Sequence, residues 1–160
     1  MKHKTSSIFA AFISVLVLFF SASLVYAQDV GQNTSDPWSE NQLIEPEALA
    51  ETLSDSLSAK PLILHIGVLF QFKIAHIPGA KHTGMASTPG GIETLKKEVE
   101  SIPRDSQIIL YCGCCPWKDC PNVRPAFKLM QEMGFTKVQV LFISKNLQKD
   151  WIDKNFSIEK

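Results

Sequence analysis

The sequence predicts a three-layer α/β domain, in which helices flank a mainly parallel central sheet. Three apolar runs, 61–68, 108–111 and 137–143, alternate along the chain with stretches that have the spacing of helices. The first two runs are almost wholly apolar, which is typical of strands buried on both faces, and the third alternates between apolar and polar residues. Strands and helices that alternate in this way form parallel sheets covered by helices.

The N-terminus has the pattern of a secretory signal peptide. Lys-His-Lys at positions 2–4 makes a basic start, residues 8–25 are apolar apart from three serines, and Val-Tyr-Ala at 25–27 suits a signal peptidase. We therefore expect cleavage after Ala27 and export to the periplasm or secretion. The alternative is an uncleaved membrane anchor, because the apolar run could nearly span a bilayer.

The charge of the mature chain argues against two classes of partner. The sequence has 16 basic and 16 acidic side chains, and cleavage removes Lys2 and Lys4, which leaves 14 basic against 16 acidic side chains and a net charge of −2. This balance gives no electrostatic attraction to nucleic acid or anionic lipid, so we expect neither nucleic acid nor a membrane as partner after cleavage. The remaining residues, about 130, make one domain with an ordinary core, which we expect to be a monomer.

The first half of the mature chain is expected to hold a leader, a helix, a strand and a turn. Residues 28–42 are polar and show no periodicity, which predicts a flexible leader. From Pro46 the pattern is helical, and leucines recur at four-residue steps at positions 49, 53 and 57. The strand at 61–68 follows, and a Pro-Gly pair at 78–79 marks a turn.

The second half is expected to hold two helices, two strands and a last helical or irregular piece. Gly90-Gly91 precedes a helix at 92–101, and the helix at 123–133 stops at Gly134, which suits the left-handed position after a helix. Residues 147–151 follow the third strand and precede a polar tail.

The loop between the second strand and the next helix is where we expect the chemistry. All four cysteines of the chain fall within residues 112–120. Backbone N–H groups at a helix N-terminus point at such a sulfur, and the helix dipole favours a thiolate there. Ligands of parallel α/β sheets sit at the carboxyl ends of strands, where Cys112 falls. Asn122 has the right chemistry to cap the helix that follows.

Three blocks of sequence, taken in order, resemble the rhodanese-like domain family. They are the strand at 62–66, His-Ile-Pro-Gly-Ala at 76–80, and Ile-Leu-Tyr-Cys at 109–112 followed by a helix that ends at Gly134. The resemblance implies a rhodanese-like domain at 43–158. It also implies that Cys112 is a nucleophile that takes a sulfane sulfur from a donor such as thiosulfate, holds it as a persulfide and passes it to a thiol acceptor.

The chain departs from this family in two places. The family usually has an Asp, an Arg two residues on and then a Glu around its first long strand, whereas the matching positions here are His65, Gly67 and Gln71. The stretch from Cys112 to Gly134 is five residues longer than the family pattern, and the extra length carries three further cysteines.

The resemblance and the loop chemistry together predict the site residues. Cys112 is the expected nucleophile, and Cys115 and Cys120 are candidate resolving thiols, which can attack a persulfide or sulfenic acid on another cysteine. The residues expected to bind substrate are Gly113, Cys114, Trp117, Lys118 and Arg124. We expect a small sulfur donor, a thiol acceptor and a redox partner protein as partners, and neither a cofactor nor a metal.

Two other interpretations of the four cysteines stay open. In an oxidising space two disulfides could brace the loop of a non-catalytic binding module, and the sequence does not choose among the three pairings. Four thiolates in one loop could also hold zinc, copper(I) or an iron–sulfur cluster, although structural zinc generally uses two separated Cys-x-x-Cys pairs.

Three histidines and one tryptophan are weaker candidates. We expect His76 to be a hydrogen-bonded structural residue in its turn rather than a general base. His65 is expected to be a satisfied core histidine near a strand end, from which it could approach the site, and His82 to be exposed. Trp117 could be a hydrophobic lid on a pocket or an anchor for the loop.

Overall fold

The computed structural model describes residues 36–160, so the predicted signal peptide and residues 28–35 of the expected leader lie outside the described residues. Five parallel strands form one sheet in the order β1-β5-β4-β2-β3. The strands are β1 (Leu43–Ile44), β2 (Leu62–His65), β3 (Lys81–His82), β4 (Gln107–Tyr111) and β5 (Lys137–Leu141). This is the parallel sheet that the sequence predicts.

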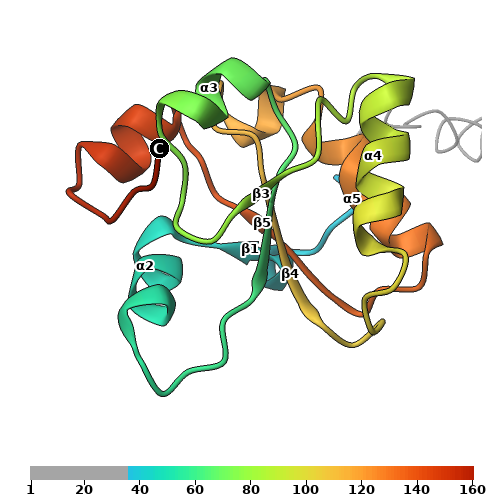
Figure 1. Cartoon of the computed structure of the whole chain (residues 1–160), viewed down its shortest axis with the longest axis horizontal. Helices are drawn as coiled ribbons and strands as arrows, with labels where there is room; N and C mark the ends of the chain where they lie inside the picture. The colour runs from blue at the N-terminus through green and yellow to red at the C-terminus, as the bar shows by residue number, and fades with distance from the viewer. Residues whose placement is uncertain (1–35) are drawn as a thin grey trace, which may run out of the picture. The chain divides into compact units, whose positions relative to one another are not determined.

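Helices cover both faces of the sheet. Within residues 36–160 the α-helices are α2 (Pro46–Ser54), α3 (Leu69–Ile74), α4 (Pro89–Val99) and α5 (Val123–Glu132), and a π-helical turn spans Gln148–Ile152. Helices α4 and α5 lie side by side on one face, and α2 lies on the other (Figure 1). In the part of the chain that the structure describes, no helix is long and apolar enough to cross a membrane.

Successive residues of the central strands enter two separate cores. Ile108 and Leu110 of β4 pack with Phe127 under α4 and α5, whereas Ile109 packs with Leu49 of α2 on the opposite face. This alternation is the ordinary period of a strand, and burial on both faces explains why residues 108–110 are all apolar.

The packed structure starts before residue 43, where the domain was expected to begin. Trp38 is only 8% exposed, and its ring packs edge-on against those of Phe127 and Trp117. Residues 40–42 form a 3₁₀ turn that leads into β1. Because one aromatic ring buries a large apolar area, Trp38 holds the second half of the expected leader against the core.

The helix that starts at Pro46 is confirmed, but it is shorter than the leucine spacing suggests. It ends at Ser54, and Leu57 is 94% exposed. The Asp55 carboxylate accepts the N–H of Leu57, and the Lys60 ammonium donates to the carbonyls at the end of α2. These side chains satisfy the last turn locally and stop the helix.

The remaining expectations differ from the structure mainly at boundaries. Helix α4 begins at Pro89 rather than at residue 92, because the Thr88 hydroxyl accepts the N–H of Gly91 and caps the helix. Helix α5 ends as predicted, with Gly134 at a φ of +81°. The sequence reading missed α3 and the two-residue strands β1 and β3.

Candidate functional site

Cys112 lies at the carboxyl end of β4, next to the end of β2. It is 3% exposed and faces a cavity of about 290 Å³. Helix α3, the start of the cysteine loop and residues 146–152 form the walls of this cavity. The chain leaves β2 toward β3 and leaves β4 toward β5, which lie on opposite sides in the sheet. This divergence creates the crevice in which open α/β sheets hold ligands.

The four cysteines form one cluster of free thiols. The Sγ atoms of Cys112 and Cys114 are 3.2 Å apart, as are those of Cys114 and Cys115. The sulfurs of Cys112, Cys114 and Cys120 all lie within 4.8 Å of one another. Cys114, which was expected to bind substrate, therefore lies in direct contact with the predicted nucleophile.

The pKa values of the three other thiols are raised above their ordinary value. Burial raises the pKa of Cys114 to about 11, and burial also raises the pKa of Cys115. The pKa of Cys120 is raised because its thiol hydrogen-bonds to Cys112 and because it is buried. A protonated thiol can donate a weak hydrogen bond, so Cys112 has S–H donors beside it.

The sequence suggested that the Asn122 side chain caps α5, but it makes no capping hydrogen bond. Its backbone is already helical, whereas a capping residue has extended geometry. Instead its side-chain Nδ2 donates to Cys112 Sγ at 3.4 Å, and its Oδ1 accepts the N–H of Ser87 at 2.9 Å. The side chain is therefore fixed at one end and directs an N–H group toward the sulfur at the other. Sequence reasoning missed this role.

The N-terminus of α5 acts on Cys120. The backbone N–H groups of Asn122 and Val123 hydrogen-bond to its sulfur. These bonds lower the pKa of Cys120, but the hydrogen bond with Cys112 and burial raise it by more. The helix N-terminus was expected to act on Cys112. The last cysteine before the helix, rather than the first, receives these groups.

Gly67 makes room for the sulfur of Cys112. A Cβ atom on Gly67 would lie 2.8 Å from Cys112 Sγ and 3.0 Å from both the Cys112 carbonyl oxygen and His65 Nε2. The resemblance implies an Arg at this position, where the glycine has no side chain. The close approach of backbone to sulfur was not visible in the sequence.

His65 lines the cavity and forms a hydrogen-bonded pair with His82. His65 Nε2 lies 2.9 Å from the Cys112 carbonyl oxygen, which can only accept, so Nε2 carries the proton. His65 Nδ1 lies 2.9 Å from His82 Nδ1 and, in neutral His65, must accept from it. Burial, with the nearby His82 and His76, lowers the pKa of His65 to about 4. His82 is half-buried rather than exposed as expected.

Gly113 ties the cysteine loop to the far wall of the cavity. Its φ of +80° belongs to the left-handed region, and its carbonyl oxygen accepts the N–H of Leu147 at 2.9 Å. A Cβ on Gly113 would lie 3.1 Å from the Leu147 Cβ. Only glycine combines this backbone angle with this contact.

The structure does not place Trp117, Lys118 or Arg124 in the walls of this cavity. Trp117 anchors the loop, because its N–H donates to the Ile143 carbonyl at 2.8 Å and its ring packs on Trp38. Arg124 forms an ion pair with Asp36 at 2.5 Å, and Lys118 is exposed. Trp117 and Arg124 therefore make structural contacts, and Lys118 is a surface charge.

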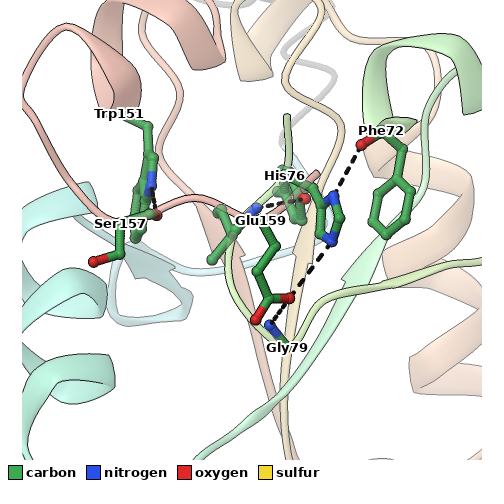
Figure 2. Close-up of polar contacts among 8 residues, drawn as sticks. Phe72, His76, Gly79, Trp151, Ser157 and Glu159 are labelled. Atoms are coloured by element: carbon green, nitrogen blue, oxygen red, sulfur yellow. Dashed lines mark hydrogen bonds and ion pairs between the residues drawn. The ribbon is translucent and has the colours of Figure 1, made fainter. Parts of the chain in front are cut away.

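His76 has the structural role expected for it. Its Nδ1 donates to the Phe72 carbonyl at 2.9 Å, and its ring stacks on that of Phe72. On the other side Nε2 lies 3.6 Å from a carboxylate oxygen of Glu159, which also accepts the Gly79 N–H at 3.0 Å (Figure 2). The block at 76–80 is thereby fastened to the end of the chain.

Comparisons with known proteins agree with this geometry. The sequence model of the rhodanese-like domain matches residues 48–142. The crystal structure of the Alr3790 protein from Anabaena sp. is similar, with a TM-score of 0.55 and 18% identity over 72% of this chain and 81% of that chain. The solution structure of the rhodanese-like domain from that protein has a TM-score of 0.54 and 19% identity over 74% and 78%. No curated protein matches the chain.

Proposed function

The chain belongs to the rhodanese-like domain family, and we propose that it transfers sulfane sulfur through Cys112. The observation that carries the proposal is the position of this one sulfur, at a strand end and facing the cavity between β2 and β4. Membership of the family supports a sulfurtransferase-type or related function in general. The persulfide relay described below is the specific form that the site supports best.

In the first step the Cys112 thiolate attacks the outer sulfur of a donor such as thiosulfate. A Cys112 S–S bond forms, the S–S bond of the donor breaks, and sulfite leaves with the bonding electron pair. The Asn122 amide, which donates to Cys112 Sγ, supports this step because it stabilises negative charge on the sulfur. In the second step an acceptor thiolate attacks the outer sulfur of the persulfide, and Cys112 leaves as a thiolate.

We further propose that Cys114 resolves the persulfide when no acceptor is bound. The Cys114 sulfur attacks Cys112 Sγ while its proton passes to the outer sulfur of the persulfide, which leaves as hydrosulfide, and a disulfide joins the two cysteines. Its sulfur lies 3.2 Å from that of Cys112, whereas the sequence had suggested Cys115 or Cys120 for this role. A small thiol or a thiol redox protein, oxidised in return, restores both cysteines.

The place of this chemistry is proposed to be the periplasm or the exterior of the cell. The basic start, the apolar run and the small residues up to Ala27 support this proposal. An oxidising space would return the cysteine pair to the disulfide form between reactions, so the domain would need a reducing partner there.

Mass spectrometry of the protein after exposure to a sulfur donor tests the assignment of the nucleophile. Cys114→Ser, which cannot resolve the persulfide, should gain one sulfur on the peptide that carries Cys112. The parent and Cys115→Ser should show either this sulfur or the disulfide between Cys112 and Cys114 that replaces it, and Cys112→Ser should show neither. If Cys114→Ser gains no sulfur from thiosulfate or from polysulfide, a non-catalytic binding module is the better description. If Cys112→Ser reacts as well as the parent, another cysteine is the nucleophile.

A further inference from the structure

Three of the four sulfurs are arranged as a ligand set. The Sγ atoms of Cys112, Cys114 and Cys120 lie within 4.8 Å of one another, and no carboxylate or imidazole belongs to the group. We propose that these three cysteines bind one copper(I) ion. The proposal concerns binding alone and holds whether or not Cys112 also transfers sulfur.

The spacing of the sulfurs fits a single ion. A metal with sulfur bonds of about 2.3 Å keeps three sulfurs about 4 Å apart when it lies in their plane. The contact between Cys112 and Cys114 is 3.2 Å and the outer limit of the set is 4.8 Å, so the present distances bracket that value. Small side-chain rotations, with no movement of the backbone, would complete the site.

The number and kind of ligands favour copper(I) over other ions. Thiolates are soft ligands, which select copper(I), zinc and iron–sulfur clusters over harder ions. Structural zinc almost always has four ligands, and here the fourth cysteine, Cys115, lies outside the set, with its sulfur against that of Cys114. The three sulfurs lie within 4.8 Å of one another, which leaves no room for an iron–sulfur cluster between them.

The surroundings compensate the charge that binding creates. Three Cu–S bonds form, the thiol protons leave to the solvent, and a site with three thiolates and one monovalent ion carries two negative charges. The Asn122 amide donates to Cys112 Sγ, and the backbone N–H groups of Asn122 and Val123 donate to Cys120 Sγ. These donors already face two of the three sulfurs, so they need not reorganise when the ion binds.

The ion has an entry path. Cys112 and Cys114 both line the cavity of about 290 Å³, whereas Cys120 is 1% exposed and lies behind them. A copper(I) ion delivered through the cavity would meet two sulfurs first and then the third. Because Cys112 would be a ligand, it could not accept sulfur while the ion is bound.

The experiment is a competition titration of the reduced full chain without oxygen. Copper(I) is added in the presence of bicinchoninate, a coloured chelator, and the loss of its complex reports the copper held by the protein. We expect the parent to bind one ion. Cys112→Ser, Cys114→Ser and Cys120→Ser should each lower the affinity about 100-fold or more, because loss of a ligand exceeds the 10- to 100-fold cost of losing a partner of a ligand.

The matched comparison is Cys115→Ser, which removes a thiol from the same loop but not from the proposed set. Its copper affinity should stay within about threefold of the parent value. Unfolding transitions of all four variants show which of them are folded, and a variant that has lost its fold is replaced by the Cys→Ala substitution at the same position. An equal loss in Cys115→Ser, no competition by the parent, or a clear preference for zinc over copper(I) would each overturn the proposal.

Discussion

The backbone of Gly67 and the sulfur of Cys112 approach each other so closely that no side chain fits between them. A Cβ on Gly67 would lie 2.8 Å from Cys112 Sγ, and Cβ atoms in proteins essentially never make contacts this short. The same atom would press on the Cys112 carbonyl and on His65 Nε2, each at 3.0 Å. The absence of a side chain at Gly67 is therefore a condition for the position of the sulfur.

Gly67→Ala should displace the Cys112 sulfur and lower the rate of persulfide formation about 100-fold, because a shift of about 1 Å in a reacting atom has an effect of this size. The overpacking should also lower the free energy of unfolding by about 1–3 kcal/mol. Stopped-flow sulfur transfer and urea unfolding measure the two effects. The control is Gly90→Ala, since nothing lies within 4 Å of a Cβ there. A Gly67→Ala protein as active as this control would show that the contact is unimportant.

Asn122→Asp should raise the pH at which Cys112 becomes reactive by about one unit or more, because it replaces an N–H donor beside Cys112 Sγ with a negative charge. The new carboxylate can still accept the N–H of Ser87, so the local fold is retained. The rate of alkylation of Cys112, followed by mass spectrometry across pH, gives the midpoint. Gln107→Glu makes the same change of charge at the opposite end of β4 and should leave the midpoint where it is.

Much of the fold could be predicted because buried parallel strands are apolar without interruption. The runs that contain β2 and β4 show this, and Gly134 marks the end of α5. Helix α3 could not be predicted in this way, because its six residues lack an alternation of apolar and polar faces. Phe70 and Ile74 are apolar and yet exposed, so the usual relation between hydrophobicity and burial fails there.

The site could be predicted only in part. Cys112 was identifiable because it directly follows a strand. The contact with Cys114 depends on the left-handed backbone of Gly113, and the sequence gives the glycine but not its angle. Asn122 resembled a helix cap because the same amide can serve either purpose, and only its backbone conformation decides between them. Arg124 was expected to bind substrate because it is a positive charge close to the cysteine loop. The sequence does not reveal that this charge is paired with Asp36.

The stability of the domain should fall as the pH is lowered through the range of His65. Its pKa is about 4 in the folded chain and 6.5 in its unperturbed state. Between these values the unfolded chain binds a proton that the folded chain does not, so protonation favours unfolding as the pH falls. The loss should approach about 3 kcal/mol by pH 4.

Urea unfolding at a series of pH values, for the parent and for His65→Asn, tests this prediction. The variant should lose less stability than the parent between pH 6.5 and pH 4.5, because its side chain cannot take up a proton. Parallel curves for the two proteins would mean that His65 does not govern this part of the pH dependence.

Cells that produce the protein should hold a mature form that begins at Gln28. N-terminal sequencing of the purified protein reads this directly. Ala27→Arg should yield the uncleaved chain, because signal peptidase requires a small residue at that position. Recovery of the parent protein with Met1 at its N-terminus would contradict cleavage and favour the membrane anchor.

Sulfur transfer should depend on the ambient redox potential through Cys114. When a disulfide joins Cys112 and Cys114, no thiolate is free to accept sulfur, and reduction restores the reaction. A dithiol–disulfide pair changes its equilibrium constant tenfold for about 30 mV, so activity should rise from low to full over a narrow range of thiol–disulfide buffers. Cys114→Ser should abolish this dependence while keeping the first transfer step, because the Cys114 sulfur lies 3.2 Å from that of Cys112. Cys115→Ser should keep the dependence, because the Cys115 sulfur contacts Cys114 instead. If Cys115→Ser or Cys120→Ser is the variant that loses the dependence, that cysteine is the resolving thiol, as the sequence suggested. A flat response of the parent, with four free thiols throughout, would leave Cys112 acting alone.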